Sequence, residues 1–259
     1  MKKIEYIYED EDILVCHKPA GIATEGAKVS SIDLISAARN YLARKERGKG
    51  VRPYVATVHR LDQPVEGVVI LAKTKKAAGD IAEQIKRRTT EKYYYALCYG
   101  NLPESKGHLT DYLIRREDSL AAVVTESEKD TFSDGVITLE NGEKIRTVGG
   151  DVKKAELEYE VIARDGETTL LRIKLLTGRF HQIRVQLSHL GFPILGENRY
   201  GSPESVKYSE EHCIKDICLV SFKFVLKHPS NKKKMVFEIA PDNPQIRSIL
   251  EKNRQSETK

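Results

Sequence analysis

The sequence predicts an α+β fold in which a largely antiparallel sheet is flanked by helices. Strand-like segments outnumber helical ones, and most are joined by short polar turns, which favour antiparallel pairing over long crossovers. At 259 residues the chain can bury a full core, and no linker-like stretch divides it. We therefore expect one domain over residues 1–250, followed by a polar, disordered tail at 251–259.

The predicted strands are apolar or alternating runs that end at turn residues. The clearest is the run Val-Val-Ile-Leu-Ala at 68–72, which is continuous and rich in β-branched residues. Turn signals Asp134-Gly135 and Asn141-Gly142 predict an inserted hairpin within 126–150. The other expected strands lie at 4–8, 13–16, 93–99, 109–114, 120–124, 157–162, 168–176, 217–226 and 235–239.

Helices are predicted where apolar residues recur every three or four positions. The first follows a cap at Ser30 or Ser31, and the second follows a cap at Thr74. A short third helix spans 183–190, and a fourth begins at Pro244.

The chain carries a net charge of +5 with a pI near 8.8, which is compatible with nucleic acid without proving it. The distribution of charge says more. A basic, glycine-containing stretch at 44–52, called the basic loop below, is expected to contact phosphate. Two further clusters, at 86–88 and 232–234, are better explained as solvated surface. The cations of the basic loop are Arg44, Lys45, Arg47, Lys49 and Arg52.

Several classes of protein are disfavoured by what the sequence lacks. It has no phosphate loop or dinucleotide fingerprint, and its four cysteines follow no metal-ligand or redox spacing. It has no apolar run long enough to cross a membrane and no apolar signal region at its start. We expect a soluble, cytoplasmic, monomeric protein with no cofactor, no metal and no disulfide.

The motif His59-Arg60-Leu61-Asp62 stands directly before the strand at 68–72, with Gln63-Pro64 forcing a turn between them. Asp62 is therefore expected at a turn that a rigid core strand holds in place. An aspartate there often only caps the backbone. The wider pattern of the sequence favours a chemical role.

Four blocks of sequence, in order, resemble the RluA family of RNA pseudouridine synthases. They are Ile-Leu-Val-Cys-His-Lys-Pro-Ala-Gly at 13–21, the stretch 58–74 around the HRLD motif, Lys-Tyr-Tyr-Tyr-Ala at 92–96, and Leu-Thr-Gly-Arg-Phe-His-Gln-Ile-Arg at 176–184. Val65-Glu66 replaces the usual Thr-Ser and Phe180 replaces a usual Thr, departures that concern substrate preference more than chemistry. The resemblance implies a pseudouridine synthase fold, with a long mixed sheet and a central cleft. It also implies a catalytic domain without the S4-type RNA-binding domain that many members carry.

The resemblance also implies an activity: the cofactor-free isomerisation of specific uridines in rRNA or tRNA to pseudouridine. Asp62 would attack the sugar carbon or stabilise its developing charge, with Arg184 as the cation that keeps it ionised. Tyr94 would stack on the uracil and carry protons. Arg60 would fill the space left by a flipped base, and Ile183 would pack beneath that base.

Three other interpretations stay open from the sequence. A kinase catalytic loop reads His-Arg-Asp, but Leu61 intervenes here and no glycine-rich loop is present. A two-histidine phosphoesterase would use the tripeptides at 108–110 and 228–230, which also arise by chance. A catalytically inactive RNA-binding protein is suggested by Val65-Glu66 and opposed by the presence of Asp62, Tyr94 and Arg184.

Overall fold

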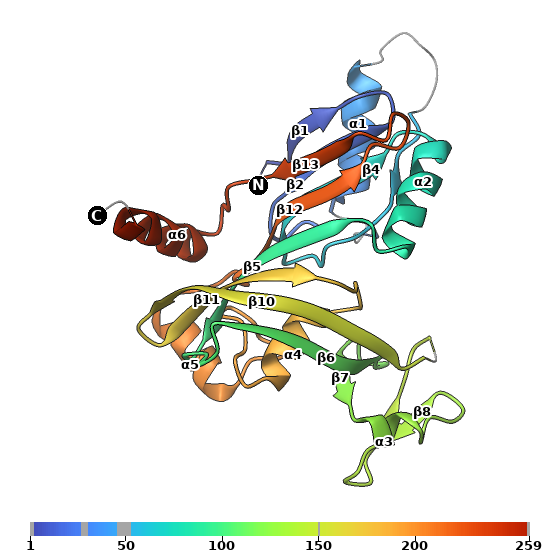
Figure 1. The fold of residues 1–259 in the computed structure, drawn as a ribbon. Coiled ribbons are helices and arrows are strands. Elements are labelled where there is room, and N and C mark those ends of the chain that lie inside the picture. The colour runs from blue at the N-terminus through green and yellow to red at the C-terminus, as the bar shows by residue number, and fades with distance from the viewer. Residues whose placement is uncertain (1–2, 27–30, 46–52, 150, 258–259) are drawn as a thin grey trace. The chain divides into compact units, whose positions relative to one another are not determined.

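The computed structural model describes residues 3–26, 31–45, 53–149 and 151–257. The chain forms two compact units (Figure 1). Unit 1 comprises the residues up to Tyr94 together with Leu219–Ser248, and unit 2 comprises Tyr95–Cys218 together with the residues from Ile249 on. The single domain expected over 1–250 and the central cleft stay predictions.

The sheet of unit 1 is built around β4 (Glu66–Ala72), in which every residue is buried. The strand order is β1-β2-β4-β12, with β3 added to β4 and β13 added to β12. β2 pairs with β4 in antiparallel register, whereas β12 pairs with β4 in parallel. A strand with neighbours on both sides and both faces covered must be apolar throughout, as the run at 68–72 predicts. The other strands are β1 (Glu5–Glu9), β2 (Ile13–Lys18), β3 (Ala56–Thr57), β12 (Leu219–Lys227) and β13 (Lys234–Glu238).

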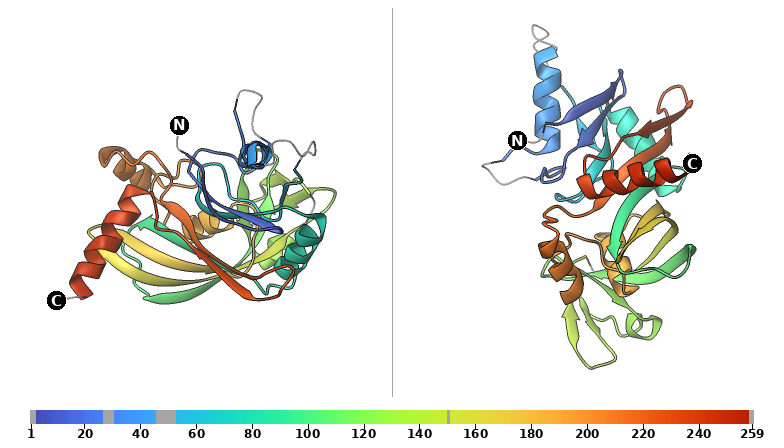
Figure 2. Two further views of the ribbon diagram at one scale, coloured as in Figure 1. Left: turned by 90° about the horizontal axis from the view of Figure 1, so that it is seen from above. Right: turned by 90° about the vertical axis from the view of Figure 1, so that its left-hand side faces the viewer.

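Two helices of unit 1 cover opposite faces of this sheet (Figure 2). Ile81 of α2 (Lys75–Lys86) packs in one core cluster with Val15 and Val68. Tyr41 of α1 (Leu34–Lys45) stacks on Tyr6, with ring centroids 4.0 Å apart. Tyr6 lies opposite Cys16 in the register, and Cys16 points away from the face of Val15 because side chains alternate along a strand.

The two helix starts in unit 1 test the predicted caps. The Thr74 hydroxyl accepts a hydrogen bond from the backbone N–H of Ala77 at 3.0 Å, which confirms it as the cap of α2. The cap predicted for α1 at Ser30 or Ser31 is wrong. The helix begins at Leu34, and the Asp33 carboxylate accepts from the backbone N–H of Ser36 at 2.8 Å, so a carboxylate placed nearer the first turn takes the role. Ser30 lies outside the described residues.

The sheet of unit 2 has the order β5-β11-β10-β6-β7, and β10 pairs with both β11 and β6 in antiparallel register. A separate hairpin of β8 and β9 lies within the segment 126–150, as expected, beside the short α3. The strands are β5 (Glu91–Tyr99), which enters unit 2 at Tyr95, β6 (Lys106–Arg115), β7 (Ala121–Val124), β8 (Val136–Thr138), β9 (Lys144–Arg146), β10 (Lys153–Asp165) and β11 (Thr168–Leu175). The helices are α3 (Glu126–Lys129), α4 (Gln182–His189) and α5 (Pro203–Glu211). The α+β class and the mixed, largely antiparallel pairing are confirmed.

Two helical segments differ from the predictions. The disordered tail expected at 251–259 is wrong for residues 251–257, which continue α6 (Pro244–Glu257). Most of these residues are good helix formers, and Lys252 reaches the Asp165 carboxylate at 2.7 Å. The helix α5 was not predicted, although Ser202 as its cap and Pro203 at its first position are start signals.

Candidate active site

Asp62 lies on the turn that leads into β4. Its backbone carbonyl accepts from the N–H of Val65 at 3.0 Å, which closes the turn around Pro64. The preceding residue, Leu61, is held on both sides by the Thr24 hydroxyl, which donates to its carbonyl at 2.9 Å and accepts from its N–H at 3.2 Å. The half-buried carboxylate of Asp62 is thus presented from a fixed backbone.

His59, in the same motif, has a structural role. Its Nε2 accepts from the backbone N–H of Ile70 at 3.0 Å, and its ring lies against Phe224 with centroids 4.6 Å apart. Burial, together with the nearby charge of Lys92, lowers the pKa of His59 to about 3. The imidazole is neutral at physiological pH and ties the motif to β4.

Lys18 is a buried cation near Asp62 that the sequence did not single out. Its side chain has no exposed area. Burial lowers the pKa of Lys18 to about 8, against the opposing effect of the carboxylates of Asp62 and Glu66. The ammonium group is therefore still protonated at neutral pH and places a fixed positive charge in the neighbourhood of Asp62. Its three N–H donors match three backbone carbonyls, those of Pro19 (3.2 Å), Ile22 (2.7 Å) and Gln63 (3.2 Å). The signal in the sequence was a lysine at the end of an apolar strand.

Tyr94 is buried at the start of β5, as the resemblance implies for an active-site residue. Burial raises the pKa of Tyr94 to about 12, a hydrogen bond with Ser221 acts against this rise, and the Asp62 carboxylate adds to it. The phenol therefore keeps its proton at neutral pH and can donate it in a hydrogen bond. Gly67 of β4 allows β12, which carries Ser221, to pack closely against β4. A Cβ at Gly67 would lie 2.5 Å from the Ser221 Cβ, so only glycine fits here.

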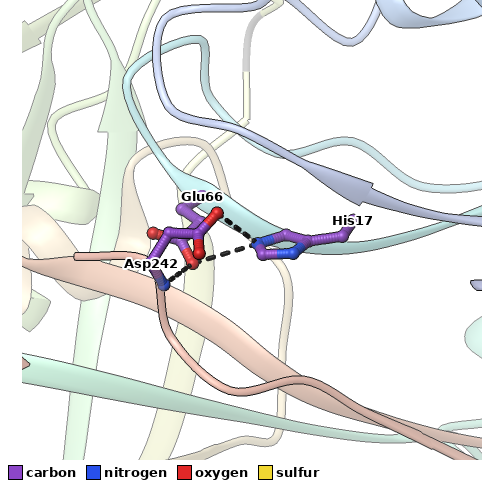
Figure 3. A group of neighbouring side chains, drawn as sticks. All are labelled: His17, Glu66 and Asp242. Carbon is purple, nitrogen blue, oxygen red and sulfur yellow. Dashed lines mark hydrogen bonds and ion pairs between the residues drawn. The ribbon is translucent and has the colours of Figure 1, made fainter. Parts of the chain in front are cut away.

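Glu66 is the centre of a buried polar cluster in unit 1 (Figure 3). His17 Nε2 lies 3.0 Å from Glu66 Oε1, and the two carboxylate oxygens accept from the backbone N–H groups of Asp242 (2.6 Å) and Asn243 (2.9 Å). Burial acts to lower the pKa of His17, but the hydrogen bond and charge of Glu66, with the charges of Asp242 and Glu5, outweigh it and raise that pKa.

The cluster also has the composition of a metal site. Ligand atoms of His17, Glu66 and Asp242 all lie within 4.8 Å of one another, a spacing that a divalent cation accepts. The backbone hydrogen bonds to both Glu66 oxygens explain the cluster as a tie between β4 and the segment before α6. That no metal takes part in the reaction stays a prediction.

In unit 2, Arg184 on α4 is buried and ion-paired. Its Nε lies 2.5 Å from Glu197 Oε2 and its Nη2 lies 3.0 Å from Oε1, while the two side chains are 6% and 2% exposed. The alternative that Arg184 is an ordinary exposed helix arginine is therefore wrong. Its action on Asp62 stays a prediction, and Glu197, which holds the guanidinium, was not found from the sequence. A glutamate followed by Asn-Arg-Tyr-Gly carries no local signal of such a role.

The other candidate residues differ in their surroundings. Arg60 is exposed and its Nη1 lies 3.0 Å from Glu25 Oε1, so it forms the surface ion pair that was weighed against a role in base flipping. Such a pair is worth only about 0–1 kcal/mol, so it does not hinder that role, which stays a prediction. Ile183 is buried on α4. Within the basic loop, Lys45 lies 2.7 Å from Glu9, whereas Arg47, Lys49 and Arg52 fall outside the described residues.

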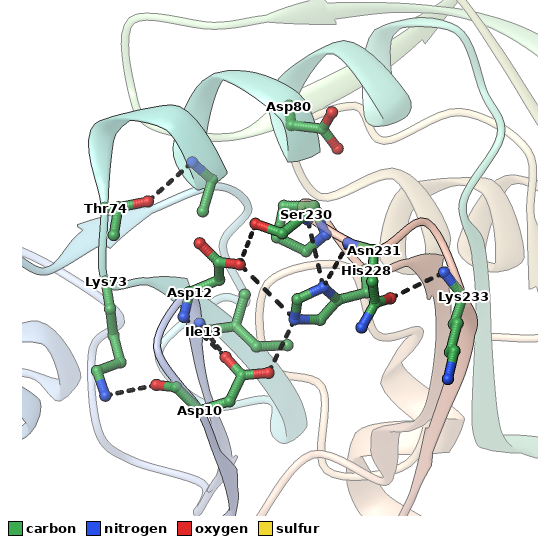
Figure 4. A network of polar contacts seen from close by, with 12 residues as sticks. Asp10, Asp12, Ile13, Lys73, Thr74, Asp80, His228, Ser230, Asn231 and Lys233 are labelled. Carbon is green, nitrogen blue, oxygen red and sulfur yellow. Dashed lines mark hydrogen bonds and ion pairs between the residues drawn. The ribbon is translucent and has the colours of Figure 1, made fainter.

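His228 argues against the phosphoesterase interpretation (Figure 4). Its Nε2 lies 2.8 Å from Asp10 Oδ2, and its Nδ1 accepts from the backbone N–H groups of Ser230 and Asn231 at 3.2 Å. Both ring nitrogens are thus engaged: Nδ1 fixes the turn between β12 and β13, and Nε2 joins this turn to the one between β1 and β2. No helix among the described residues has the length and apolar character needed to span a bilayer.

Comparisons with known proteins agree with this geometry. A family model described as RNA pseudouridylate synthase matches residues 12–189. The chain is 28% identical to ribosomal large subunit pseudouridine synthase C of Haemophilus influenzae, over 97% of this chain and 69% of the relative. It is 32% identical to an uncharacterized RNA pseudouridine synthase of Aquifex aeolicus, over 91% and 69%. It is 30% identical to the dual-specificity RNA pseudouridine synthase RluA of Vibrio cholerae, over 80% and 72%.

A solved structure supports the fold. Human RNA pseudouridylate synthase domain containing 4 superposes with a TM-score of 0.71 at 21% identity, covering 96% of this chain and 92% of that one. This likeness confirms the predicted pseudouridine synthase fold.

Proposed function

Because the chain belongs to the RNA pseudouridylate synthase family and is therefore an RNA pseudouridine synthase, we propose that Asp62 carries its chemistry, with uridines of ribosomal or transfer RNA as substrate. The observation that supports this most directly is the setting of Asp62. Its carboxylate stands on a fixed turn, within electrostatic reach of the buried Lys18 ammonium group and the Tyr94 phenol.

The reaction rearranges bonds without a net change in composition. The N1–C1′ bond of uridine breaks, the uracil turns, C5 bonds to C1′, and the proton on C5 leaves while N1 gains one. Asp62 either bonds to C1′ or stabilises the positive charge that develops on the sugar. Both roles require the carboxylate anion, and the buried ammonium group of Lys18 places a positive charge near it. In this proposal Arg184 adds a second cation.

Tyr94 supports the reaction in two ways. Its ring offers a face on which the detached uracil can stack while it turns. Since its pKa is about 12, the phenol is a hydrogen-bond donor at neutral pH and can hold an oxygen or nitrogen of the uracil in place. Arg60, which is exposed and ion-paired with Glu25 at the surface, can move into the space that a flipped base leaves.

The substrate class rests on the relatives. Their names include synthases of the ribosomal large subunit and a dual-specificity enzyme, which supports rRNA or tRNA as the target here. The cations of the basic loop would contact RNA phosphates, and Lys45 would then exchange Glu9 for a phosphate. We further propose that the protein acts in the cytoplasm as a monomer.

The substitution Asp62→Asn tests the assignment, because it keeps the shape of the side chain and removes its charge. Pseudouridine formed in unmodified rRNA and tRNA transcripts is measured by chemical labelling and primer extension. We expect the variant to fold and to bind RNA like the wild type but to form no pseudouridine. Asp134→Asn, an exposed aspartate in the hairpin segment, is the matched control. Activity of Asp62→Asn within tenfold of wild type would refute the role of Asp62, and an inactive wild type would favour the RNA-binding alternative.

A further inference from the structure

Three planar groups stack on one another where α4 begins in unit 2. The rings of Phe180 and His181 lie nearly parallel, with centroids 3.7 Å apart and an interplanar angle of 21°. On Phe180 rests the guanidinium of Arg115, whose Cζ lies 4.5 Å from the ring centroid. His181 is buried, Phe180 is half-buried and Arg115 is exposed, so the stack runs from the core outward. We call these three residues the Arg115 stack.

The base of the Arg115 stack is rigid. His181 has a left-handed backbone with φ of 53°, and its Nδ1 lies 2.7 Å from the Tyr200 hydroxyl. That hydroxyl in turn accepts from the backbone N–H of Ala121 in β7 at 2.6 Å. Phe180 and Tyr200 both pack against the core cluster that contains Val185. The positions of the His181 and Phe180 rings are therefore fixed by contacts with Tyr200, with β7 through Tyr200, and with the Val185 core cluster.

Arg115, the outer layer, differs from two other arginines of unit 2 in that no described carboxylate pairs with it. Arg116 pairs with Asp118 at 2.8 Å and Arg184 pairs with Glu197. In the part of the chain that the structure describes, the guanidinium of Arg115 has no such ion pair, and its contact is the face of Phe180. Arg115 is also exposed, so a ligand can reach its guanidinium from solvent.

We propose that the Arg115 stack is a binding subsite for one unpaired nucleobase of the RNA substrate, which adds a fourth layer on the guanidinium of Arg115. Unpaired bases are recognised by stacking on aromatic rings and on arginine planes, and the contact with Phe180 restrains the position of the Arg115 guanidinium. This inference rests on the proposed function, because it takes RNA as the substrate. It makes Phe180 and Arg115 determinants of which RNA is bound, while the chemistry stays with Asp62.

Phe180 is the residue on which the subsite depends. The resemblance described above leads one to expect a threonine at this position of the block 176–184. A threonine has no ring, whereas the Phe180 ring lies against both His181 and the guanidinium of Arg115.

A phosphate contact is the competing explanation for Arg115, and the substitution Arg115→Lys distinguishes it from base stacking. Lysine keeps the charge but has no plane, so Arg115→Lys preserves an ion pair with phosphate and abolishes stacking. Phe180→Leu keeps an apolar side chain of similar reach and removes the ring beneath the arginine. Arg116→Lys, at the adjacent and ion-paired arginine, is the matched control.

The probe is an unpaired RNA dodecamer in which an abasic nucleotide replaces each position in turn, together with the intact dodecamer. Affinity of each for the full-length protein is measured by fluorescence anisotropy at constant salt. For the wild type we expect one position at which the abasic probe binds about tenfold more weakly than the intact one. Arg115→Lys and Phe180→Leu should bring this ratio close to one, and Arg116→Lys should leave it unchanged.

Two outcomes would overturn the inference. If Arg115→Lys still binds the abasic probe about tenfold more weakly than the intact one, the base stacks elsewhere. If the wild type binds the abasic and intact probes equally at every position, Arg115 contacts phosphate or nothing. Pseudouridine formation by the wild type is measured on rRNA and tRNA transcripts in parallel. If it is present while the ratio is flat, the subsite alone is wrong. If it is absent, the proposed function fails first.

Discussion

Replacing Glu197 by glutamine should cost this protein far more stability than a similar change at an exposed ion pair. The Arg184 and Glu197 side chains are 6% and 2% exposed, and two donor-acceptor contacts of 2.5 and 3.0 Å join them. Glutamine keeps the shape of the side chain but removes the negative charge that balances the buried guanidinium. Removal of one partner of a buried pair costs roughly 3–5 kcal/mol, because the remaining charge has lost its hydration as well as its partner.

The exposed pair Arg60–Glu25 provides the internal reference, since its side chains are 69% and 38% exposed. Glu25→Gln should cost no more than about 1 kcal/mol, because solvent screens both charges. At about 2–4 °C per kcal/mol for a chain of this size, Glu197→Gln should lower the melting temperature by roughly 6–20 °C.

Thermal unfolding followed by circular dichroism and by calorimetry measures both losses. The double variant Arg184→Met with Glu197→Leu should recover part of the lost stability, since it leaves no buried charge behind. A loss below about 1 kcal/mol for Glu197→Gln, or one equal to that of Glu25→Gln, would contradict the view that the ion pair is a buried, charge-balanced unit.

Four further predictions concern the site. Activity should fall as pH rises through about 8, where Lys18 releases its proton and the positive charge near Asp62 is lost, and the residual activity of Lys18→Met should lack this fall. The free energy of unfolding should rise between pH 8 and 10. In this range the folded chain has released the Lys18 proton while the unfolded chain keeps it up to about 10.4, so the unfolded state binds more protons. A free energy of unfolding that falls over this range would contradict the assignment. Arg60→Ala should lose more single-turnover activity on a paired target than on a flexible single strand, because only the former has a stack to break, and equal losses would remove Arg60 from base flipping. Turnover should survive treatment with EDTA when the RNA stays folded; a loss restored by a divalent ion would contradict the metal-free reaction and make the His17, Glu66 and Asp242 cluster the first site to mutate.

The sequence predicted those features whose cause lies within a few residues. Thr74 was identified as a cap because a hydroxyl three positions before a backbone N–H is a local geometry. Asp62 was identified by its motif and by the strand that follows. Glu197 and Ser221 were missed, because each acts on a residue distant in sequence, and neither lies in a pattern that chain order alone connects to Arg184 or Tyr94.

The tail shows a different limit of sequence reasoning. A polar segment such as 251–257 can be a solvated helix or disordered chain, and composition does not separate them. Here the preceding Pro244 starts a helix, and the contact of Lys252 with Asp165 supports its later turns. The deciding contact lies far away in the sequence, as it does for Glu197.

The two departures from the family pattern have different physical consequences. Glu66 stands where a serine is usual, and its buried carboxylate is hydrogen-bonded to His17 and to the backbone N–H groups of Asp242 and Asn243. Its effect is to tie β4, the strand that follows the Asp62 turn, to the segment before α6. Phe180 stands where a threonine is usual and lies beneath the exposed guanidinium of Arg115, so its effect is at the surface of unit 2. Replacing Phe180 should therefore change which RNA is preferred. Replacing Glu66 should instead lower the stability of the protein and so reduce activity on every RNA alike.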